Sequence, residues 1–250
     1  MQDTNQNVLV WNVRGLNARC RRDVLRDVSR ETRATIVCVQ ETKVASISPF
    51  LVSEMLGSSF TSYAFAPSIG ASGGILTACK GPDLSCTTLH IGRFSVTVTI
   101  STTGSSDHWC LTNVYGPQAE ADKIDFLNEL RMVHTMVTPM WVIAGDFNMV
   151  LEAEDRNIET TNRRTLARFR RLPDDLQLKD VYLRGRKYTW SNERSQPTMA
   201  RLDRVIVSVE WEANFPSSFL QALSSDMSDH SQVPFRVLVA KITWVPGGRG

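Results

Sequence analysis

Short apolar runs separated by polar segments dominate the chain, and they predict more strands than helices. Three runs are continuously apolar and of strand length, which is typical of central strands covered on both faces: Val8–Trp11, Ala34–Val39 and Trp141–Ala144. Further strands are expected at Gly73–Cys79, Phe94–Ile100, Trp109–Tyr115, Arg201–Val207 and Val233–Val239. Pro234 favours an edge or bulge position for the last of these strands.

Helical periodicity is confined to three segments. Between Glu120 and Val137, apolar residues recur at spacings of four, three and four and form one stripe. A second helix is expected at Arg21–Thr32, and a third begins near Asn162, where Pro173 should end or kink it. Many strands with a few interspersed helices predict an α/β fold in which two sheets pack face to face with helices outside.

Length and composition indicate an ordinary globular protein. The chain has 250 residues, of which 42% are hydrophobic and 22% charged, enough apolar residues for a substantial core. No apolar run approaches the roughly 18–20 residues of a membrane span. The polar start does not resemble a signal peptide, the five cysteines include no C-x-x-C pair, and no glycosylation sequon is present. We therefore expect an intracellular protein, nuclear or cytoplasmic and not secreted, in which 1–245 form one domain and 246–250 a tail.

Basic residues are concentrated between positions 163 and 204, although the net charge of the chain is only +2. They are Arg163, Arg164, Arg168, Arg170 and Arg171, followed by Arg184, Arg186, Lys187, Arg194, Arg201 and Arg204. Such a stretch can pair with phosphates along a nucleic acid. A solvated helix face with ordinary loop charge is the alternative, and the charges alone do not distinguish the two.

Polar residues that could bind a metal or take part in catalysis lie at the ends of the predicted strands. Four strands end in Asn12, Gln40–Glu41, Asn113–Tyr115 and Gly145–Asn148, whereas Asp203 and Asp229–His230 precede strands. Strand ends can converge at one rim of a sandwich when strand directions alternate suitably. We therefore expect one cleft that contains Asn12, Glu41, Tyr115, Asp146, Asn148, Asp203, Asp229 and His230.

The residue types at these strand ends are those that phosphodiester hydrolysis requires. A hard cation such as Mg²⁺ prefers oxygen ligands and keeps several of its waters. Glu41 can bind such a cation, and Asn12 and Asp229 can assist. A lone acid or amide at a strand end is usually a turn residue or a helix cap, so it is the combination of several segments that favours a catalytic site.

The remaining polar residues fit the chemical steps around the metal. Asp146 can take a proton from the attacking water, which Asn148 orients. A protonated His230 and the hydroxyl of Tyr115 can donate hydrogen bonds to phosphate oxygens. Asp203 can hold the imidazole ring of His230, as carboxylates commonly do for catalytic histidines.

Seven segments in order resemble the motifs of the endonuclease/exonuclease/phosphatase superfamily. They are Trp11–Asn17, Gln40–Thr42, Ser72–Ile75, Asn113–Pro117, Gly145–Asn148, Arg201–Arg204 and Ser228–His230. Gly-Asp-Phe-Asn is fairly specific by itself, and the order of all seven covers nearly the whole chain. The resemblance implies a four-layer α/β sandwich made of two packed, mainly antiparallel β-sheets flanked by helices.

The resemblance also assigns roles to the residues at the rim. It implies that Glu41 binds the metal and that Asp229 lies near it. The full metal set is Asn12, Glu41 and Asp229, and the full catalytic set is Tyr115, Asp146, Asn148, Asp203 and His230. Mg²⁺ is the expected cofactor, with Mn²⁺ as a substitute.

Within this superfamily the chain most resembles the endonuclease domain of plant non-LTR (LINE-type) retrotransposons, which are similar to apurinic/apyrimidinic endonucleases. The segment Tyr188–Asn192 ahead of Arg201–Arg204 supports this placement. Repair-type relatives carry an acid where this chain has Arg14, which disfavours abasic-site repair. Retrotransposon relatives continue into a reverse transcriptase, so we expect a fragment, an isolated domain or a degenerate copy of a larger polyprotein.

The expected partner is nucleic acid, double-stranded DNA in the first place, bound by a monomer. The basic stretch from 163 to 204 favours it, and Trp190 is suited to stacking on a base or entering a groove. The candidate contacts with nucleic acid are Arg163, Arg164, Trp190, Asn192 and Arg201.

Three other functions are compatible with parts of the sequence. Gly70–Gly74 matches the G-x-S-x-G pattern of serine hydrolases, but that motif requires a following helix and a strand-like run follows here. Another phosphoesterase of the same fold, acting on a phosphoinositide, sphingomyelin or RNA, shares the catalytic set, because specificity lies in the loops. A catalytically inactive nucleic-acid-binding module is the non-enzymatic alternative.

Overall fold

The computed structural model describes residues 6–70, 72–158, 162–192 and 194–223, and the backbone of 237–242. Within these ranges the α-helices are α1 (Arg19–Glu31), α2 (Pro49–Leu56), α3 (Lys123–His134), α4 (Arg163–Asp175) and α5 (Val209–Asn214). Two short 3-10 turns, η1 (Glu120–Asp122) and η2 (Ala153–Asp155), precede α3 and α4. No helix in the described residues has the length and apolar character needed to cross a membrane.

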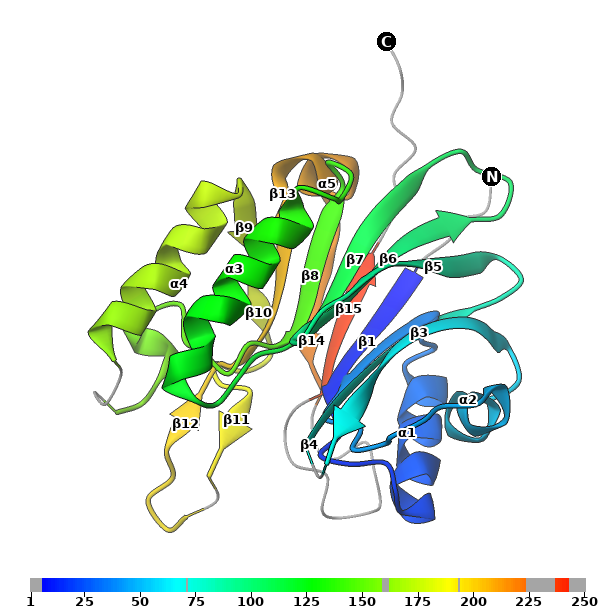
Figure 1. Ribbon diagram of the computed structural model, residues 1–250, viewed down its shortest axis with the longest axis horizontal. Helices are drawn as coiled ribbons and strands as arrows, with labels where there is room; N and C mark the ends of the chain where they lie inside the picture. The colour runs from blue at the N-terminus through cyan, green and yellow to red at the C-terminus, as the bar shows by residue number, and fades with distance from the viewer. Residues whose placement is uncertain (1–5, 71, 159–161, 193, 224–236, 243–250) are drawn as a thin grey trace.

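Most of the described strands belong to two large sheets (Figure 1). The order in the seven-stranded sheet is β10 (Leu183–Arg184), β14 (Phe219–Ala222), β15 (Val237–Ile242), β1 (Gln6–Asn12), β2 (Ile36–Gln40), β4 (Ser72–Lys80) and β3 (Phe60–Ile69). The order in the six-stranded sheet is β5 (Leu84–Ile91), β6 (Ser95–Thr102), β7 (His108–Tyr115), β8 (Trp141–Asp146), β13 (Asp203–Ser208) and β9 (Leu178–Asp180). A hairpin of β11 (Trp190–Ser191) and β12 (Met199–Ala200) projects from one end of the sandwich (Figure 1).

The two sheets pack face to face and carry helices on their outer faces. Helices α1 and α2 cover the seven-stranded sheet, and α3 and α4 cover the six-stranded sheet (Figure 1). Between the sheets lies an apolar core that includes Val10, Cys38, Val98, Leu111 and Val205. The sequence-based prediction of a four-layer α/β sandwich is therefore confirmed.

Amphipathic stripes attach the two helical layers. In α1 the buried positions include Leu25 and Val28, which are three residues apart, and in α3 they include Phe126 and Leu130, which are four apart. These spacings place each pair on one helix face. Full burial of side chains of this size contributes about 1.5–3 kcal/mol each, so the stripes hold the helices against the sheets.

A parallel strand pair lies at the centre of each sheet. Strands β1 and β2 pair in parallel and are connected through α1, whereas β7 and β8 pair in parallel and are connected through α3. Apart from β10 and β14, the other paired strands of the two described sheets run antiparallel. Parallel neighbouring strands end at the same edge of a sheet. The last residues of β1 and β2 therefore lie side by side, as do those of β7 and β8.

Some elements lack a clear signal in the sequence. Helix α2 begins after Ser48, whose hydroxyl accepts a hydrogen bond of 3.2 Å from the backbone N–H of Leu51, but the helix is too short for a repeated apolar stripe. Strands β3 and β5 are edge strands that alternate irregularly between buried and exposed positions. The expected helix from 120 to 137 divides into η1 and α3, and Pro173 lies in the last turn of α4.

Buried amides join the two sheets close to one end of the apolar core. Gln40 Nε2, on β2, donates a hydrogen bond of 2.6 Å to Asn113 Oδ1, on β7. Asn113 Nδ2 in turn donates to the carbonyl oxygen of Leu76 at 3.0 Å and to Thr77 Oγ1 at 3.2 Å. Both amides are fully buried, so these bonds offset a desolvation cost that would otherwise oppose sheet packing.

We predict that Asn113→Leu lowers the free energy of unfolding by about 1–3 kcal/mol, because Gln40 would keep a buried donor without its acceptor. Urea denaturation measures this change. The double variant Gln40→Leu/Asn113→Leu removes both polar groups and should lose less than the sum of the single variants. Additive losses would contradict a direct bond between the sheets.

Candidate active site

Side-chain alternation decides which polar residues face the space between the sheets. On β1, Val8 and Val10 lie in the inter-sheet core, so Asn12 points to the same side. The residues of equal parity at the ends of the other strands are Gln40 on β2, Tyr115 on β7, Asp146 on β8 and Asp203 on β13. The core between the sheets therefore becomes polar at one rim of the sandwich.

Strand register aligns these residues at one level. In the six-stranded sheet, Asp146 pairs with Tyr115 on one side and with Asp203 on the other. In the seven-stranded sheet, Asn12 pairs with Gln40. Asn12 Nδ2 donates a hydrogen bond of 2.8 Å to Asp146 Oδ2 and so connects the two rows across the sandwich. The fold thus brings together at one rim the groups that come from five different strands.

The Gly-Asp-Phe-Asn segment makes the sharp turn that ends β8. Gly145 has φ 141°, and a Cβ at this position would collide with the carbonyl oxygen of Val114, so only glycine fits. Phe147 points to the outer side, where its ring lies 6.0 Å from that of Phe126 on α3 and 5.3 Å from that of Phe169 on α4. The turn is therefore anchored to both helices of its outer layer.

Asp146 is fully buried and is held at both carboxylate oxygens. Its Oδ2 accepts the bond from Asn12, and its Oδ1 accepts a bond of 2.9 Å from the backbone N–H of Asn148. Asn148 has a left-handed backbone, with φ 49°, and its Nδ2 donates to the carbonyl oxygen of Gly116 at 2.8 Å. The carboxylate of Asp146 and the side chain of Asn148 are therefore fixed relative to each other.

Glu41 follows β2 at the point where the regular alternation breaks. Its backbone is left-handed, with φ 55°, a conformation that costs roughly 1–2 kcal/mol for a residue with a Cβ. The next residue, Thr42, is buried and donates its backbone N–H to the carbonyl oxygen of Gly74 at 3.0 Å. A side chain at Gly74 would collide with Thr42. Backbone strain of this kind concentrates at functional sites.

The oxygen donors beside Glu41 fit a hard cation. The Glu41 carboxylate is partly exposed and forms an ion pair with Lys43, whose Nζ lies 3.0 Å from Glu41 Oε1. Asn12 contributes an amide oxygen, which accepts the backbone N–H of Arg14 at 3.2 Å. Mg²⁺ commonly uses only one or two protein carboxylates and keeps its waters. Among the residues that the structure describes, no cluster of three His, Cys, Asp or Glu suited to a metal occurs.

Thr189 positions the backbone at the start of β13. Its Oγ1 accepts hydrogen bonds from the backbone N–H groups of Leu202, at 3.0 Å, and Asp203, at 3.1 Å. Its own N–H donates to the carbonyl oxygen of Ala200 at 3.0 Å. Thr189 and Asp203 are both buried, and Thr189 holds the hairpin through its backbone N–H and Asp203 through its side chain.

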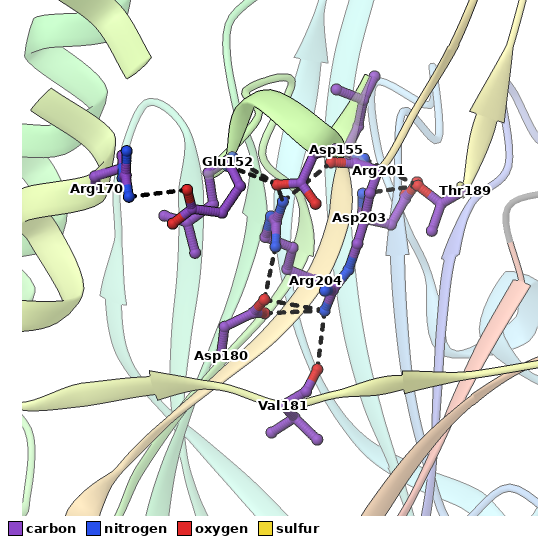
Figure 2. A network of polar contacts seen from close by, with 11 residues as sticks. Glu152, Asp155, Arg170, Asp180, Val181, Thr189, Arg201, Asp203 and Arg204 are labelled. Atoms are coloured by element: carbon purple, nitrogen blue, oxygen red, sulfur yellow. Dashed lines mark hydrogen bonds and ion pairs between the residues drawn. The ribbon is translucent and has the colours of Figure 1, made fainter. Parts of the chain in front are cut away.

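Figure 2 shows a network of two arginines and two aspartates beside the rim. Arg204, which is fully buried, donates to Asp180 Oδ2 at 2.7 Å and also pairs with Asp155. Arg201 donates to Asp180 Oδ1 at 3.1 Å and to the carbonyl oxygen of Val181 at 2.9 Å. The guanidinium of Arg201 thus has partners inside the protein, and its contact with nucleic acid stays a prediction.

Burial determines the ionisation behaviour of this network. It raises the pKa of Asp180, and the neighbouring Arg204 and Arg201 offset part of that shift. Because the folded-state pKa then exceeds the unfolded-state value, the stabilising contribution of Asp180 is complete below the unfolded-state pKa and is lost as the pH rises through the folded-state pKa. Burial also lowers the pKa of Arg201. The network thus carries a desolvation cost and serves to hold β9, β13 and η2 in one arrangement.

The other predicted contacts with nucleic acid lie on the hairpin and on α4. Trp190 begins β11 and packs partly against the small apolar cluster under the hairpin. Asn192 Oδ1 accepts the backbone N–H of Thr198 at 2.9 Å and so closes the hairpin loop. Arg163 and Arg164 are exposed in the first turn of α4.

Sequence reasoning placed Gln40 and Asn113 at strand ends and Thr189 in a motif, but it assigned them no role in supporting the rim. All three are buried polar residues, and for Gln40 and Asn113 the interruption of an apolar run is the signal that could have revealed that role. Asp229 and His230 lie outside the described residues, so their metal and phosphate roles stay predictions.

We predict that Arg204→Met lowers the free energy of unfolding by about 3–5 kcal/mol, because the largely buried carboxylates of Asp155 and Asp180 lose the cation that they share. Urea denaturation at neutral pH measures the loss. Arg164→Met makes the same chemical change at an exposed position and should alter stability by no more than about 0.5 kcal/mol. Equal effects of the two substitutions would contradict the proposed importance of the buried network.

Thr189→Val is predicted to destabilise the protein by about 2 kcal/mol, because two buried N–H groups lose their acceptor while side-chain volume is kept. Thr189→Ser retains the hydroxyl and should restore most of the loss. Thermal unfolding followed by circular dichroism compares the variants. If serine were no better than valine, the hydrogen bonds of the hydroxyl would not be what stabilises this region.

The fold occurs in solved structures with low sequence identity. The endonuclease domain of TRAS1, a telomere-specific non-LTR retrotransposon, aligns with a TM-score of 0.69 and 15% identity over 95% of this chain and 98% of that one. The AP endonuclease LMAP from Leishmania major aligns with a TM-score of 0.69 and 16% identity over 97% of this chain and 88% of that one. TDP2 from D. rerio, complexed with a single-strand DNA product, aligns with a TM-score of 0.63 and 15% identity over 97% of this chain and 100% of that one.

Family membership follows from the sequence rather than from these structural similarities. No curated protein matches the chain. Residues 9–230, however, match the Endonuclease/Exonuclease/phosphatase family, and this range contains the strand ends that form the polar rim. The chain therefore belongs to the endonuclease/exonuclease/phosphatase family.

Proposed function

We propose that this protein hydrolyses phosphodiester bonds in nucleic acid, as a Mg²⁺-dependent nicking endonuclease of the retrotransposon type that acts on double-stranded DNA. The observation that carries the proposal is the fixed carboxylate of Asp146. It accepts hydrogen bonds from Asn12 and from the backbone N–H of Asn148. Asp146 also pairs in register with Tyr115 and Asp203 on the two neighbouring strands. Burial of a carboxylate at a rim carries a desolvation cost, and a catalytic role accounts for its presence there.

The first requirement of the reaction is a cation at Glu41. When bound, a divalent cation such as Mg²⁺, or Mn²⁺ in its place, stabilises negative charge that develops on the phosphate. Glu41 and the amide oxygen of Asn12 are the described residues that would hold it, and Asp229 is the third predicted ligand. Lys43 pairs with Oε1 of the Glu41 carboxylate, so Oε2 is the oxygen that can bind the cation without breaking this ion pair.

The second requirement is an oriented nucleophilic water. A carboxylate oxygen can accept more than one hydrogen bond, so Asp146 can accept a proton from water in addition to the bonds from Asn12 and Asn148. The Nδ2 of Asn148 is committed to Gly116, which leaves its Oδ1 to accept a hydrogen bond from the same water. General-base catalysis of this kind contributes about 10²–10⁴-fold.

The third requirement is a set of donors for the phosphate. Tyr115 is partly exposed at the rim and has a hydroxyl that can donate to a phosphate oxygen. A protonated His230 is the second predicted donor, with Asp203 as the carboxylate that orients its ring. The start of β13 already holds Asp203 rigidly through Thr189.

Nucleic acid is favoured as the substrate by the surroundings of the rim. The β11–β12 hairpin projects from this end of the sandwich and carries Trp190 and Asn192, and Arg163 and Arg164 are exposed in the first turn of α4 (Figure 1). The structural neighbours include a retrotransposon endonuclease domain and an AP endonuclease. We propose a monomer in the nucleus or cytoplasm and a chain that derives from a reverse-transcriptase polyprotein.

We predict that the protein converts supercoiled plasmid to open circles in Mg²⁺ or Mn²⁺, and that EDTA prevents this. Glu41→Gln and Asp146→Asn should each reduce the nicking rate by at least about 10²-fold, because they remove a metal ligand and the proposed base. Plasmid binding should persist in both variants. Phe50→Ala, at an exposed position on α2, is the control that should leave nicking unchanged.

Absence of nicking by folded wild type supplied with Mg²⁺ and Mn²⁺ would refute the DNA endonuclease proposal. Hydrolysis of RNA, a phosphoinositide or sphingomyelin by the same preparation would then identify another phosphoesterase of this family. DNA binding without hydrolysis of any of these substrates would indicate an inactive nucleic-acid-binding module. A serine hydrolase is excluded, because Ser72 begins strand β4 and is not followed by a helix.

A further inference from the structure

Two arginine-rich helices of equal length lie on opposite outer layers of the sandwich. Helix α1 contains five arginines in 13 residues, and α4 also contains five in 13. Each helix buries one apolar stripe, so the arginines of both lie mainly toward solvent. The two helices therefore provide an internal comparison of how exposed arginines are used (Figure 1).

Most arginines of α1 have partners within the protein. Arg22 pairs with Glu54, and Arg30 pairs with Asp27. Arg21 and Arg26 donate to the carbonyl oxygens of Arg14 and Ser53. Arg21, Arg22 and Arg26 attach α1 to α2 and to the loop after β1, and Arg30 pairs within α1, so contacts inside the protein account for these arginines.

The arginines of α4 are arranged differently. Arg170 pairs with Glu152. The side chains of Arg164, Arg168 and Arg171 are exposed and form no ion pair or hydrogen bond with the described part of the chain. Their spacing of four and three residues places them on one face of the helix. We call these three residues the α4 ridge.

The stability of the helix does not account for the α4 ridge. Like charges three and four residues apart destabilise a helix by a few tenths of a kcal/mol per pair. The helix also has no acidic residue in its first turn and no basic residue in its last turn, the reverse of what the helix dipole prefers. Asp175, on the same face, is neutralised by Arg131 of α3 and not by the ridge. The ridge is therefore a surface of uncompensated positive charge.

We propose that the α4 ridge binds the phosphate backbone of the substrate nucleic acid away from the bond that is cleaved. This inference rests on the proposed function and adds a second contact surface to it. Successive ridge residues are separated by about 6 Å and about 4.5 Å along the helix axis. Three guanidinium groups at this spacing can contact neighbouring phosphates of one strand, and arginine favours bidentate contact with phosphate.

The position of the ridge makes its contribution dependent on substrate length. Helix α4 begins at the end of the sandwich from which the β11–β12 hairpin projects, and it runs away from that end along the six-stranded sheet (Figure 1). A nucleic acid bound at the rim therefore reaches Arg164 first and Arg171 last. A short duplex centred on the rim would not reach the whole ridge, whereas a longer one that extends along this side would.

The test measures DNA binding in EDTA by fluorescence anisotropy over a series of KCl concentrations. The probes are duplexes of about 10 base pairs, which is one helical turn, and about 30 base pairs. The test variant replaces Arg164, Arg168 and Arg171 with Gln, and the matched control replaces Arg19, Arg26 and Arg30 of α1 with Gln. A third variant replaces the three ridge residues with Lys. Circular dichroism confirms that each variant is folded.

We expect the ridge Gln variant to lower the slope of log affinity against log salt concentration by about 2–3 on the longer duplex, because each lost phosphate contact removes about 0.9. The slope on the short duplex should fall by no more than about 1, because Arg164 is the ridge residue nearest the rim. The α1 variant, which loses the same net charge, should behave as wild type, and the Lys variant should keep the wild-type slope.

An unchanged slope for the ridge variant, or an equal loss for the α1 variant, would overturn the proposal. If the triple Gln variant does not fold, Arg168→Gln alone should lower the slope on the longer duplex by about 1, and no change would overturn the proposal equally. These outcomes are distinct from failure of the proposed function, which would appear as wild type that neither binds nor nicks DNA. If wild type nicks plasmid and the ridge variant binds DNA normally, the proposed function stands and only the proposal for the α4 ridge is refuted.

Discussion

The need to hydrogen-bond polar side chains between two packed sheets is the constraint on which this structure depends. Strand alternation directs Asn12 and Asp146 into the space between the sheets, and an unpaired buried polar group costs about 1–3 kcal/mol. Their mutual hydrogen bond meets that need and joins the sheets at the rim. Gln40, which pairs with Asn12 on the neighbouring strand, forms a second such connection with Asn113. The bonds that position the candidate site are therefore also bonds that hold the fold together.

Backbone strain is concentrated where the strands reach this rim. Arg14, Glu41 and Asn148 adopt left-handed conformations directly after β1, β2 and β8, although none of them is glycine. The cost is roughly 1–2 kcal/mol each for Arg14 and Glu41 and smaller for Asn148, because asparagine tolerates the left-handed region. The packing of Phe147 between α3 and α4 is large enough to offset part of this cost next to Asn148. The scaffold thus supplies the energy that holds the turns of the site in unfavourable conformations.

Arginine serves two opposite purposes on this side of the protein. Arg204 is buried and shared between Asp155 and Asp180, an arrangement that costs desolvation and fixes the relative positions of β9, β13 and η2. The arginines of the α4 ridge are exposed and uncompensated, and they suit a polyanionic partner. Composition and net charge do not separate the two uses, because both sets come from the same basic stretch between 163 and 204.

The sequence by itself determined the fold class, the central strands and the polar residues at their ends. These features depend on alternation and on the order of a few short motifs, both of which are properties of neighbouring residues. Periodicity alone did not reveal the parallel pairing at the centre of each sheet, the short helix α2 or the edge strands β3 and β5. The structure alone decided that Arg201 is engaged with Asp180, and that Thr189 holds Asp203. Such contacts join residues that are distant in the chain, and the apolar burial that brings them together is non-directional, so only the packed tertiary structure specifies which groups meet.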